Sequence, residues 1–463
     1  MYLRVQSLGL LLCASAFSQT ADLQQDVETA APAPALSSAH SKMFEMKSGD
    51  LVRVGGKRTG QSAGDFGIEA YVYTSKGTLA AKDDEEADHA FFEWKAAKPG
   101  LYYIVVRNSS SVDGVFWVTL VRGAKAGVAM GEADFAAVKV YYATNRSAES
   151  GGGRAAPYYL SDPQAEDAYS LGTALVTIPR SHEMGELEGP SIYKLEFHQD
   201  PKKHVVLSSV TPEPVAVFFK DLRDRVSGTP HRDVFVFVHG FNVTFEDAVR
   251  RTAQIAYDLG FAGAPVVFSW PSKGSKLEYL HDVTVADTSA VALRTFLADL
   301  SAKSGATTVH LIAHSMGNRV LGRALETMAA GAPSQPHFRE IALFAPDVDA
   351  DLLRQMSAAI RARADRVTLY SSKGDEALDL SQKLAGRPRA GQTVQFIPGI
   401  QAIDASPANT SLLGLSHSYF GDSSSVLADL YHLLLGESPD SRFGLERVNT
   451  AKGVYWRFKR TAR

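Results

Sequence analysis

Hydrophobic and polar residues follow two different patterns in two successive parts of the chain. From about residue 43 to residue 121, short runs alternate apolar and polar positions, as in Ile68–Tyr73 and Leu101–Val106, and Gly, Asn, Asp and Ser separate the runs. Strands and turns at this spacing are typical of an antiparallel β-sandwich. We therefore expect a small all-β sandwich domain over residues 41–123.

From residue 234 onward, wholly apolar runs alternate with longer amphipathic stretches. Val234–Val238 contains no polar residue, as expected of a central parallel strand buried on both faces. Thr244 is placed to cap a helix that follows it. The repeated alternation predicts a mostly parallel sheet with helices on both faces, in a catalytic domain over residues 136–440. We expect residues 441–463 to form a C-terminal tail.

The N-terminus has the pattern of a secretory signal peptide over residues 1–18. Arg4 precedes the apolar core Leu8–Ala16, which contains small residues suited to a cleavage site. Residues 19–40, rich in Gln, Ala, Pro and Ser, predict a disordered linker. The single cysteine, Cys13, follows the bulky Leu12, which argues against a lipoprotein. We expect an exported protein, periplasmic or secreted, whose mature chain has no integral membrane span.

Charge and cysteine content argue against a nucleic-acid partner, a disulfide framework and a Cys-based metal site. The formal net charge of −3 over 463 residues provides no electrostatic reason to expect a nucleic-acid partner. One cysteine allows neither a disulfide framework nor a Cys-based metal site.

The strongest chemical signal is the stretch Val309–Asn318, in which an apolar run leads into Ala-His-Ser-Met-Gly and a helix-forming stretch follows. This is the order of a nucleophile elbow, in which a sharp strand-to-helix turn carries the serine. The residues two before and two after the serine must be small, and here they are Ala313 and Gly317. The pattern predicts Ser315 as a nucleophile.

A serine nucleophile needs a base and an orienting acid. His417 lies after the last strand expected in the parallel sheet and before the last helix, which is the position expected of the base. His432 is expected within a helix, His314 adjoins the serine, and His239 ends a strand where it is expected to orient a loop.

Three carboxylates are candidates for the acid. Asp375 follows the second strand after the elbow, and Asp347 and Asp349 follow the first. All three satisfy the order Ser, Asp, His along the chain. Asp375 is the favoured acid and Asp347 is the alternative, although Asp375 also fits the N-cap of a helix.

Two backbone N–H groups are expected to form the oxyanion hole. Met316 follows the nucleophile, and Phe241 lies in the loop after Val234–Val238, where Gly240 lets the chain turn. Trp270 and Tyr279 follow the neighbouring strand and are expected to line the substrate pocket, although a packing role is also open.

Together these residues resemble a family of bacterial α/β-hydrolases of unknown function in the esterase/lipase superfamily. The resemblance spans about residues 138–437, and the preceding Lys98–Val106 loosely resembles pre-peptidase-C-like sandwich domains. The motifs that carry it are Tyr-Ala-Thr-Asn-Arg (142–146), Val-His-Gly-Phe-Asn (238–242), Phe-Ser-Trp-Pro-Ser (268–272), Tyr279 with Asp282, Ala-His-Ser-Met-Gly-Asn (313–318), Ala-Pro-Asp-Val-Asp (345–349) and His-Ser-Tyr-Phe (417–420).

The resemblance implies an α/β-hydrolase fold and a serine hydrolase that uses no metal and no cofactor. The expected reaction is cleavage of a small-molecule or lipid carboxylic ester through an acyl-enzyme. A peptidase, a thioesterase or an acyltransferase with the same triad, and a non-catalytic binding protein of the cell envelope, are the alternatives. The sequence leaves the acyl chain and the oligomeric state open.

Overall fold

A computed structural model describes most of the chain. The signal peptide expected over residues 1–18 and the base expected at His417 lie outside the described residues. The described residues are 28–33, 40–47, 50–58, 68–74, 79–83, 91–108, 114–121, 128–129, 135–148, 159–164, 168–179, 182, 185–189, 199–229, 231–273, 278–329, 336–408, 423–442 and 444–459.

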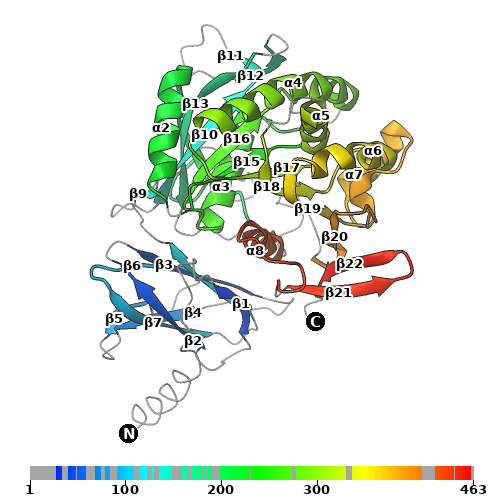
Figure 1. The fold of residues 1–463 in the computed structure, drawn as a ribbon. Coiled ribbons are helices and arrows are strands. Elements are labelled where there is room, and N and C mark those ends of the chain that lie inside the picture. The colour runs from blue at the N-terminus through cyan, green and yellow to red at the C-terminus, as the bar shows by residue number, and fades with distance from the viewer. Residues whose placement is uncertain are drawn as a thin grey trace.

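The main domain is built on one large sheet whose centre is parallel (Figure 1). Mostly apolar runs form its central strands, because a strand covered by helices on both faces has few positions that face solvent. At the two edges of the sheet, β13, β14 and β21 join by antiparallel pairing. In spatial order the strands are β14 (Val206–Pro212), β13 (Ser170–Pro179), β10 (Phe135–Thr144), β16 (Ala264–Ser269), β15 (Asp233–Val238), β17 (Thr308–His314), β18 (Phe338–Phe344), β19 (Ala364–Ser371), β20 (Gln401–Asp404), β22 (Gly453–Phe458) and β21 (Leu445–Thr450), with β9 (Val128–Ala129) paired to β10.

Helices cover both faces of this sheet. One face packs against α2 (Val215–Ser227), α4 (Tyr279–Lys303), α5 (Gly317–Ala329) and α6 (Ala350–Arg361), and the other against α3 (Phe245–Asp258) and α8 (Ser423–Leu434). The remaining pieces of this domain are α7 (Glu376–Ala385), the 3-10 turns η3 (Ala390–Gln392) and η4 (Ser406–Ala408), and a small hairpin of β11 (Arg146–Ala148) and β12 (Tyr159–Pro163).

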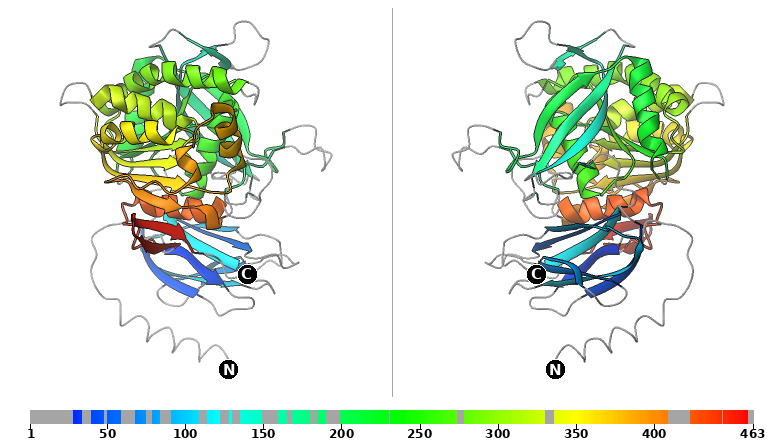
Figure 2. Two further views of the ribbon diagram at one scale, coloured as in Figure 1. Left: turned by 90° about the vertical axis from the view of Figure 1, so that its right-hand side faces the viewer. Right: turned by 90° about the vertical axis from the view of Figure 1, so that its left-hand side faces the viewer.

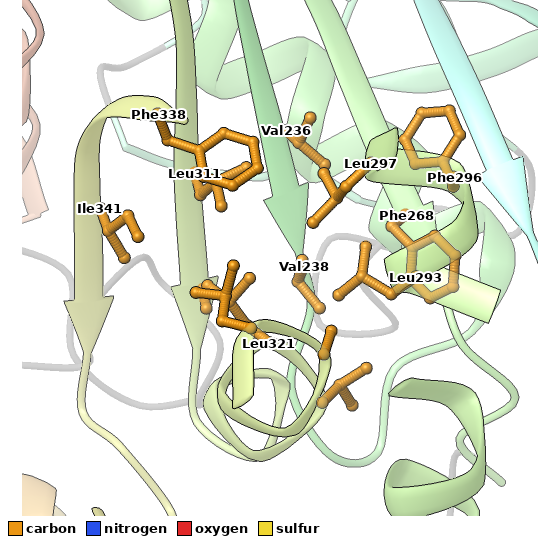
Figure 3. Packing of buried hydrophobic residues seen from close by; sticks show 14 of the residues in the cluster. Val236, Val238, Phe268, Leu293, Phe296, Leu297, Leu311, Leu321, Phe338 and Ile341 are labelled. Carbon is orange, nitrogen blue, oxygen red and sulfur yellow. The ribbon is translucent and has the colours of Figure 1, made fainter. Parts of the chain in front are cut away.

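The larger core lies between the sheet and the helices α4 and α5. Leu293 and Leu297 of α4 face Val236 and Val238 of β15, and Leu321 of α5 packs beside Leu311 of β17 (Figure 3). All of these side chains are fully buried. Their burial fixes α5 against β17, so that the turn joining them has one defined shape.

Two small antiparallel sheets precede the large one (Figure 2). Val52 and Val54 of one sheet and Val72 and Ile104 of the other belong to one buried cluster. The first sheet has the order β1 (Glu28–Ala33), β8 (Gly114–Val121), β3 (Leu51–Arg58) and β6 (Phe91–Lys95), and the second has β2 (His40–Met46), β7 (Gly100–Asn108), β4 (Ile68–Thr74) and β5 (Leu79–Asp83).

The structure differs from the expected disordered linker over residues 19–40. Residues Glu28–Ala33 form β1, which pairs with β8 at the edge of the first small sheet. The pairing uses backbone groups, and for this reason the Ala- and Pro-rich composition did not reveal it.

The prediction that the main domain ends at residue 440 and that residues 441–463 form a tail is wrong. Leu445–Thr450 and Gly453–Phe458 form a hairpin, and β22 extends the large sheet by pairing in parallel with β20. Arg442, just before the hairpin, is buried and pairs with Asp429 of α8 at 2.9 Å. The main domain therefore continues to Phe458.

Strands β10 and β15 to β20 run in one direction, apart from the antiparallel edges. Their carboxyl ends meet at one edge of the sheet, which is where ligands bind in open α/β sheets. No described helix is both long enough and apolar enough to cross a bilayer.

Candidate active site

Ser315 occupies a strained turn between β17 and α5. Its φ of +52° is unusual for a residue with a side chain, and such a conformation costs about 1–3 kcal/mol. Hydrogen bonds hold the turn: the Ser315 N–H donates to the Phe344 carbonyl at 3.0 Å, and the side-chain amide of Asn318 donates to the Ser315 carbonyl at 2.9 Å. The surrounding structure thus forces the half-buried Ser315 out of the strand line, as a nucleophile elbow requires.

Gly317 is required by the closeness of the neighbouring strand. A Cβ atom at this position would lie 2.4 Å from the carbonyl oxygens of Val238 and His239. A side chain here would push β15 away from the elbow. Ala313, on the other side of the serine, is fully buried, so both small residues expected from the motif lie in crowded positions.

The loop after β15 lies directly against the serine. A Cβ atom on Gly240 would lie 2.8 Å from the Ser315 Cβ. The N–H groups of Phe241 and Met316 donate to no protein atom in the part of the chain that the structure describes. These are the two N–H groups that the sequence predicts for the oxyanion hole, and they are available for such a role.

His239 supports this loop through four contacts. Its Nδ1 lies 2.8 Å from the Gly240 carbonyl, so Nδ1 carries the proton, and its Nε2 lies 3.2 Å from the Ser269 hydroxyl. Its ring stacks on Trp270 at 5.3 Å, and Trp270 Nε1 donates to the His239 carbonyl at 2.8 Å. Burial, together with the charge of Arg146, lowers the pKa of His239 to about 3. The imidazole is neutral and holds the loop in place.

Arg146 is a buried cation that the sequence reasoning did not single out as functional. Its guanidinium donates to the Ser269 hydroxyl at 2.9 Å, to the Val243 carbonyl at 2.8 Å and to the Ser272 carbonyl at 3.2 Å. Burial lowers its pKa to about 9, with a partly opposing effect of Asp282, so it is charged at neutral pH. It ties the ends of β15 and β16 together behind His239. The Tyr-Ala-Thr-Asn-Arg motif was the signal for it.

Asp375 is the N-cap of α7. Its Oδ1 accepts hydrogen bonds from the N–H groups of Ala377 at 3.0 Å and Leu378 at 3.1 Å. Its Oδ2 has no hydrogen-bond partner among the described residues. Burial raises the pKa of this carboxyl, the two N–H groups lower it, and the nearby carboxyl of Asp347 raises it. One oxygen is therefore fixed by the helix and the other is available to a further donor.

Asp347 has a different environment from Asp375. Only 4 % of its surface is exposed. Its carboxylate accepts from the Tyr279 hydroxyl at 3.1 Å and from Ser381, and Arg389 Nε lies 3.3 Å away. Burial raises its pKa, while the hydrogen bond from Ser381 and the charge of Arg389 oppose this. Sequence reasoning gave no sign of Ser381 or Arg389, which lie far along the chain from Asp347.

Asp349, the third candidate acid, is an N-cap. Its carboxylate accepts from the N–H groups of Asp351 at 2.9 Å and Leu352 at 3.0 Å at the start of α6. Arg387 lies 3.3 Å from its other oxygen. Both carboxylate oxygens of Asp349 therefore have partners.

Trp270 and Tyr279 are both in contact with the loop after β15. Trp270 is fully buried, and Tyr279 is 4 % exposed with its ring edge against Phe241 at 5.4 Å. These contacts show a supporting role for both rings. Their part in a substrate pocket stays a prediction.

Two described histidines near the elbow are poor candidates for a general base. Burial lowers the pKa of His314 to about 3, as it does for His239. A general base works best with a pKa close to the operating pH. The segment between Ala408 and Ser423, which contains His417, begins shortly after β20 and leads into α8.

Comparison with known proteins agrees with the architecture. Residues 216–436 match the model of a family described as "Alpha/beta hydrolase of unknown function (DUF900)". This match and the mostly parallel sheet confirm the α/β-hydrolase fold that the sequence predicts. No curated protein matches the chain.

Solved structures provide only weak similarities. Phospholipase PlaB from Legionella pneumophila in complex with thio-NAD is 13 % identical over 49 % of this chain and 67 % of its own, with a TM-score of 0.26. A carbohydrate esterase family 2 enzyme plus carbohydrate binding domain from Corynascus thermopiles (Myceliophthora fergusii) is 10 % identical over 88 % of this chain and 96 % of its own, with a TM-score of 0.19. At these TM-scores the similarity has no bearing on the function of this chain.

Proposed function

We propose that this chain, whose residues 216–436 match an α/β-hydrolase family of unknown function, is a serine hydrolase that cleaves carboxylic esters. The observation that carries the proposal is the strained Ser315, held at φ +52° beside two N–H groups that have no partner among the described residues. Backbone strain of this kind persists only where the surrounding structure maintains it, and such strained residues cluster at active sites.

The proposed reaction begins with attack of the Ser315 hydroxyl oxygen on the acyl carbonyl carbon. His417 takes the hydroxyl proton, and the free Oδ2 of Asp375 accepts from the other nitrogen of the imidazole. The carbonyl oxygen gains the negative charge, which the N–H groups of Met316 and Phe241 stabilise together with the N-terminus of α5. The alcohol leaves with the proton from His417, and water then hydrolyses the acyl-enzyme by the same steps.

The choice of Asp375 over Asp347 rests on the occupancy of their oxygens. Asp347 is surrounded by Tyr279, Ser381 and Arg389, whereas Asp375 keeps one oxygen free among the described residues. An acid that orients a histidine must offer such an oxygen.

We also propose export of the protein, supported by the signal-peptide pattern of residues 1–18.

Fluorophosphonate labelling tests the nucleophile. The full chain should be labelled, Ser315→Ala should not, and Ser301→Ala, at an exposed serine in α4, should be labelled normally. Labelling that persists in Ser315→Ala would overturn the assignment. Matched ester, thioester and amide substrates with one acyl group then identify the bond, and turnover of the amide or thioester alone would replace the ester proposal.

A further inference from the structure

Asp347 contacts three separate parts of the candidate active site. Its backbone N–H donates to the Ser315 carbonyl at 3.2 Å. Its carboxylate accepts from Tyr279, the first residue of α4, and from Ser381 in the middle of α7. Arg389 Nε, 3.3 Å away, balances its charge. A carboxylate this deeply buried and this fully paired is fixed in one position.

The first connection leads to the nucleophile. Two backbone hydrogen bonds join Ser315 to the end of β18 and the turn after it: its N–H donates to the Phe344 carbonyl at 3.0 Å, and its carbonyl accepts from the Asp347 N–H at 3.2 Å. Ala345, between these two residues, has a φ of +42°. The turn that carries Asp347 is thus itself strained, and its conformation sets that of the elbow.

The second connection leads to the oxyanion-hole loop. The Tyr279 hydroxyl lies 3.1 Å from both Asp347 oxygens and 2.7 Å from the Ser381 hydroxyl. The Tyr279 ring meets the ring of Phe241 edge to face, with an interplanar angle of 71°. Fixing the hydroxyl fixes the ring, and the ring limits where Phe241 and its N–H can lie.

The third connection leads to the proposed triad acid. Ser381 lies on the same helix as the cap residue Asp375, and its hydroxyl contacts both Asp347 and Tyr279. Holding α7 at Ser381 fixes the N–H groups of Ala377 and Leu378. These two groups hold Oδ1 of Asp375 and so direct its free oxygen.

We infer that Asp347, acting through Tyr279 and Ser381, is a positioning residue that aligns the nucleophile, the oxyanion hole and the triad acid. This inference rests on the proposed serine hydrolase function. Asp347 touches no reacting atom in this role. This positioning role is proposed in place of the alternative in which Asp347 is itself the triad acid.

Kinetics of Tyr279→Phe and Ser381→Ala test the role, with Tyr455→Phe on the C-terminal hairpin as the control. Tyr279→Phe and Ser381→Ala should each lower kcat by about ten- to a hundredfold with KM nearly unchanged, because misplaced catalytic groups slow the reaction without changing substrate binding. Tyr455→Phe should leave kcat unchanged. Affinity for a trifluoromethyl ketone, which forms a tetrahedral adduct, should fall by the same factor as kcat/KM. The double variant should lose little more than the worse single variant, since both act through Asp347. Unchanged kcat in both single variants would overturn the inference.

Asp347→Asn separates positioning from triad chemistry. It should lower kcat in the same range as Tyr279→Phe and leave the acidic limb of the pH–rate profile at its wild-type position, because His417 keeps its partner. A loss of about 10⁴-fold in Asp347→Asn with near-normal Asp375→Asn would assign Asp347 as the triad acid and overturn the inference.

Hydrogen exchange provides a readout that does not depend on catalysis. In Tyr279→Phe, amide protection should fall in peptides covering residues 238–243 and 375–379, and it should stay unchanged in Tyr455→Phe. Unchanged protection in the first variant would overturn the inference even in an active enzyme. Absence of fluorophosphonate labelling in the wild-type chain would instead overturn the proposed function, so the two failures are distinct.

Discussion

Gly240 and Ser315 approach so closely that a Cβ atom on residue 240 would lie 2.8 Å from the Cβ of the serine. The two residues are 75 positions apart and follow neighbouring parallel strands, β15 and β17. Their contact brings the loop that contains Phe241 against Ser315. Because of this contact, the loop cannot carry a side chain at residue 240 without moving.

Gly240→Ala should therefore lower kcat by about a hundredfold while the protein remains folded. The added methyl group would displace either the loop or the serine, because the same Cβ would also lie 3.1 Å from His314 Nδ1. Steady-state kinetics and a thermal melt measure the two effects. Gly444→Ala is the control, since its Cβ would have only an ordinary contact of 3.9 Å with Phe458. Wild-type kcat in Gly240→Ala would mean that the loop has no part in catalysis.

Asp375→Asn should reduce kcat by about 10⁴-fold, the effect of disturbing the histidine tautomer in a serine triad. Asparagine is as good an N-cap as aspartate, so α7 and the melting temperature should be preserved. Asp349→Asn is a matched control, because Asp349 caps α6 in the same way after the preceding strand. Equal, small effects of the two substitutions would remove Asp375 from the triad.

Stability should fall as the pH rises above neutrality because of His182. Burial alone would lower the pKa of this imidazole, but the carboxylates of Asp258 at 2.7 Å and Glu188 at 2.8 Å raise it to about 10. The unfolded value is about 6.5. The folded state thus holds the proton more tightly, and the stabilisation is complete below pH 6.5 and lost as the pH approaches 10.

Urea unfolding at pH 6.5, 8 and 9.5 measures this effect. His182→Gln should be less stable at pH 6.5 and should lose less stability than the wild type as the pH rises. His337→Gln, at an exposed histidine paired with Asp365, should keep the wild-type dependence. A parallel pH dependence in His182→Gln and wild type would contradict the prediction.

Asp429→Ala should destabilise the protein by about 3–5 kcal/mol, because it leaves a buried charge without its partner. The Asp429 carboxylate contacts Arg442 at 2.9 Å and the Tyr370 hydroxyl at 2.6 Å, and the side chains of Asp429 and Arg442 are at most 2 % exposed. Asp440→Ala breaks the exposed pair with Arg447 and should cost less than about 1 kcal/mol. Urea unfolding compares the two, and an equally small loss in both variants would mean that the buried pair of Asp429 and Arg442 does not stabilise the folded domain.

The sequence by itself determined the elements that depend on local pattern. Apolar runs predict β15 and β17 at nearly their observed bounds, since strands buried on both faces are mostly apolar. The elbow at Ser315 was also predictable, because a tight strand-to-helix turn demands small residues at fixed offsets. These are properties of short segments.

The tertiary structure alone decided which distant residues meet. The hairpin after Arg442 joined the large sheet through backbone hydrogen bonds to β20, and such bonds leave little trace in side-chain composition. Arg146 and Ser381 acquired their roles from partners 97 and 34 residues away in the chain. Asp347 and Asp375 could not be distinguished as acids from spacing alone, because both follow strands at the same edge of the sheet. They differ in how many donors surround each carboxylate, and only folding brings those donors together.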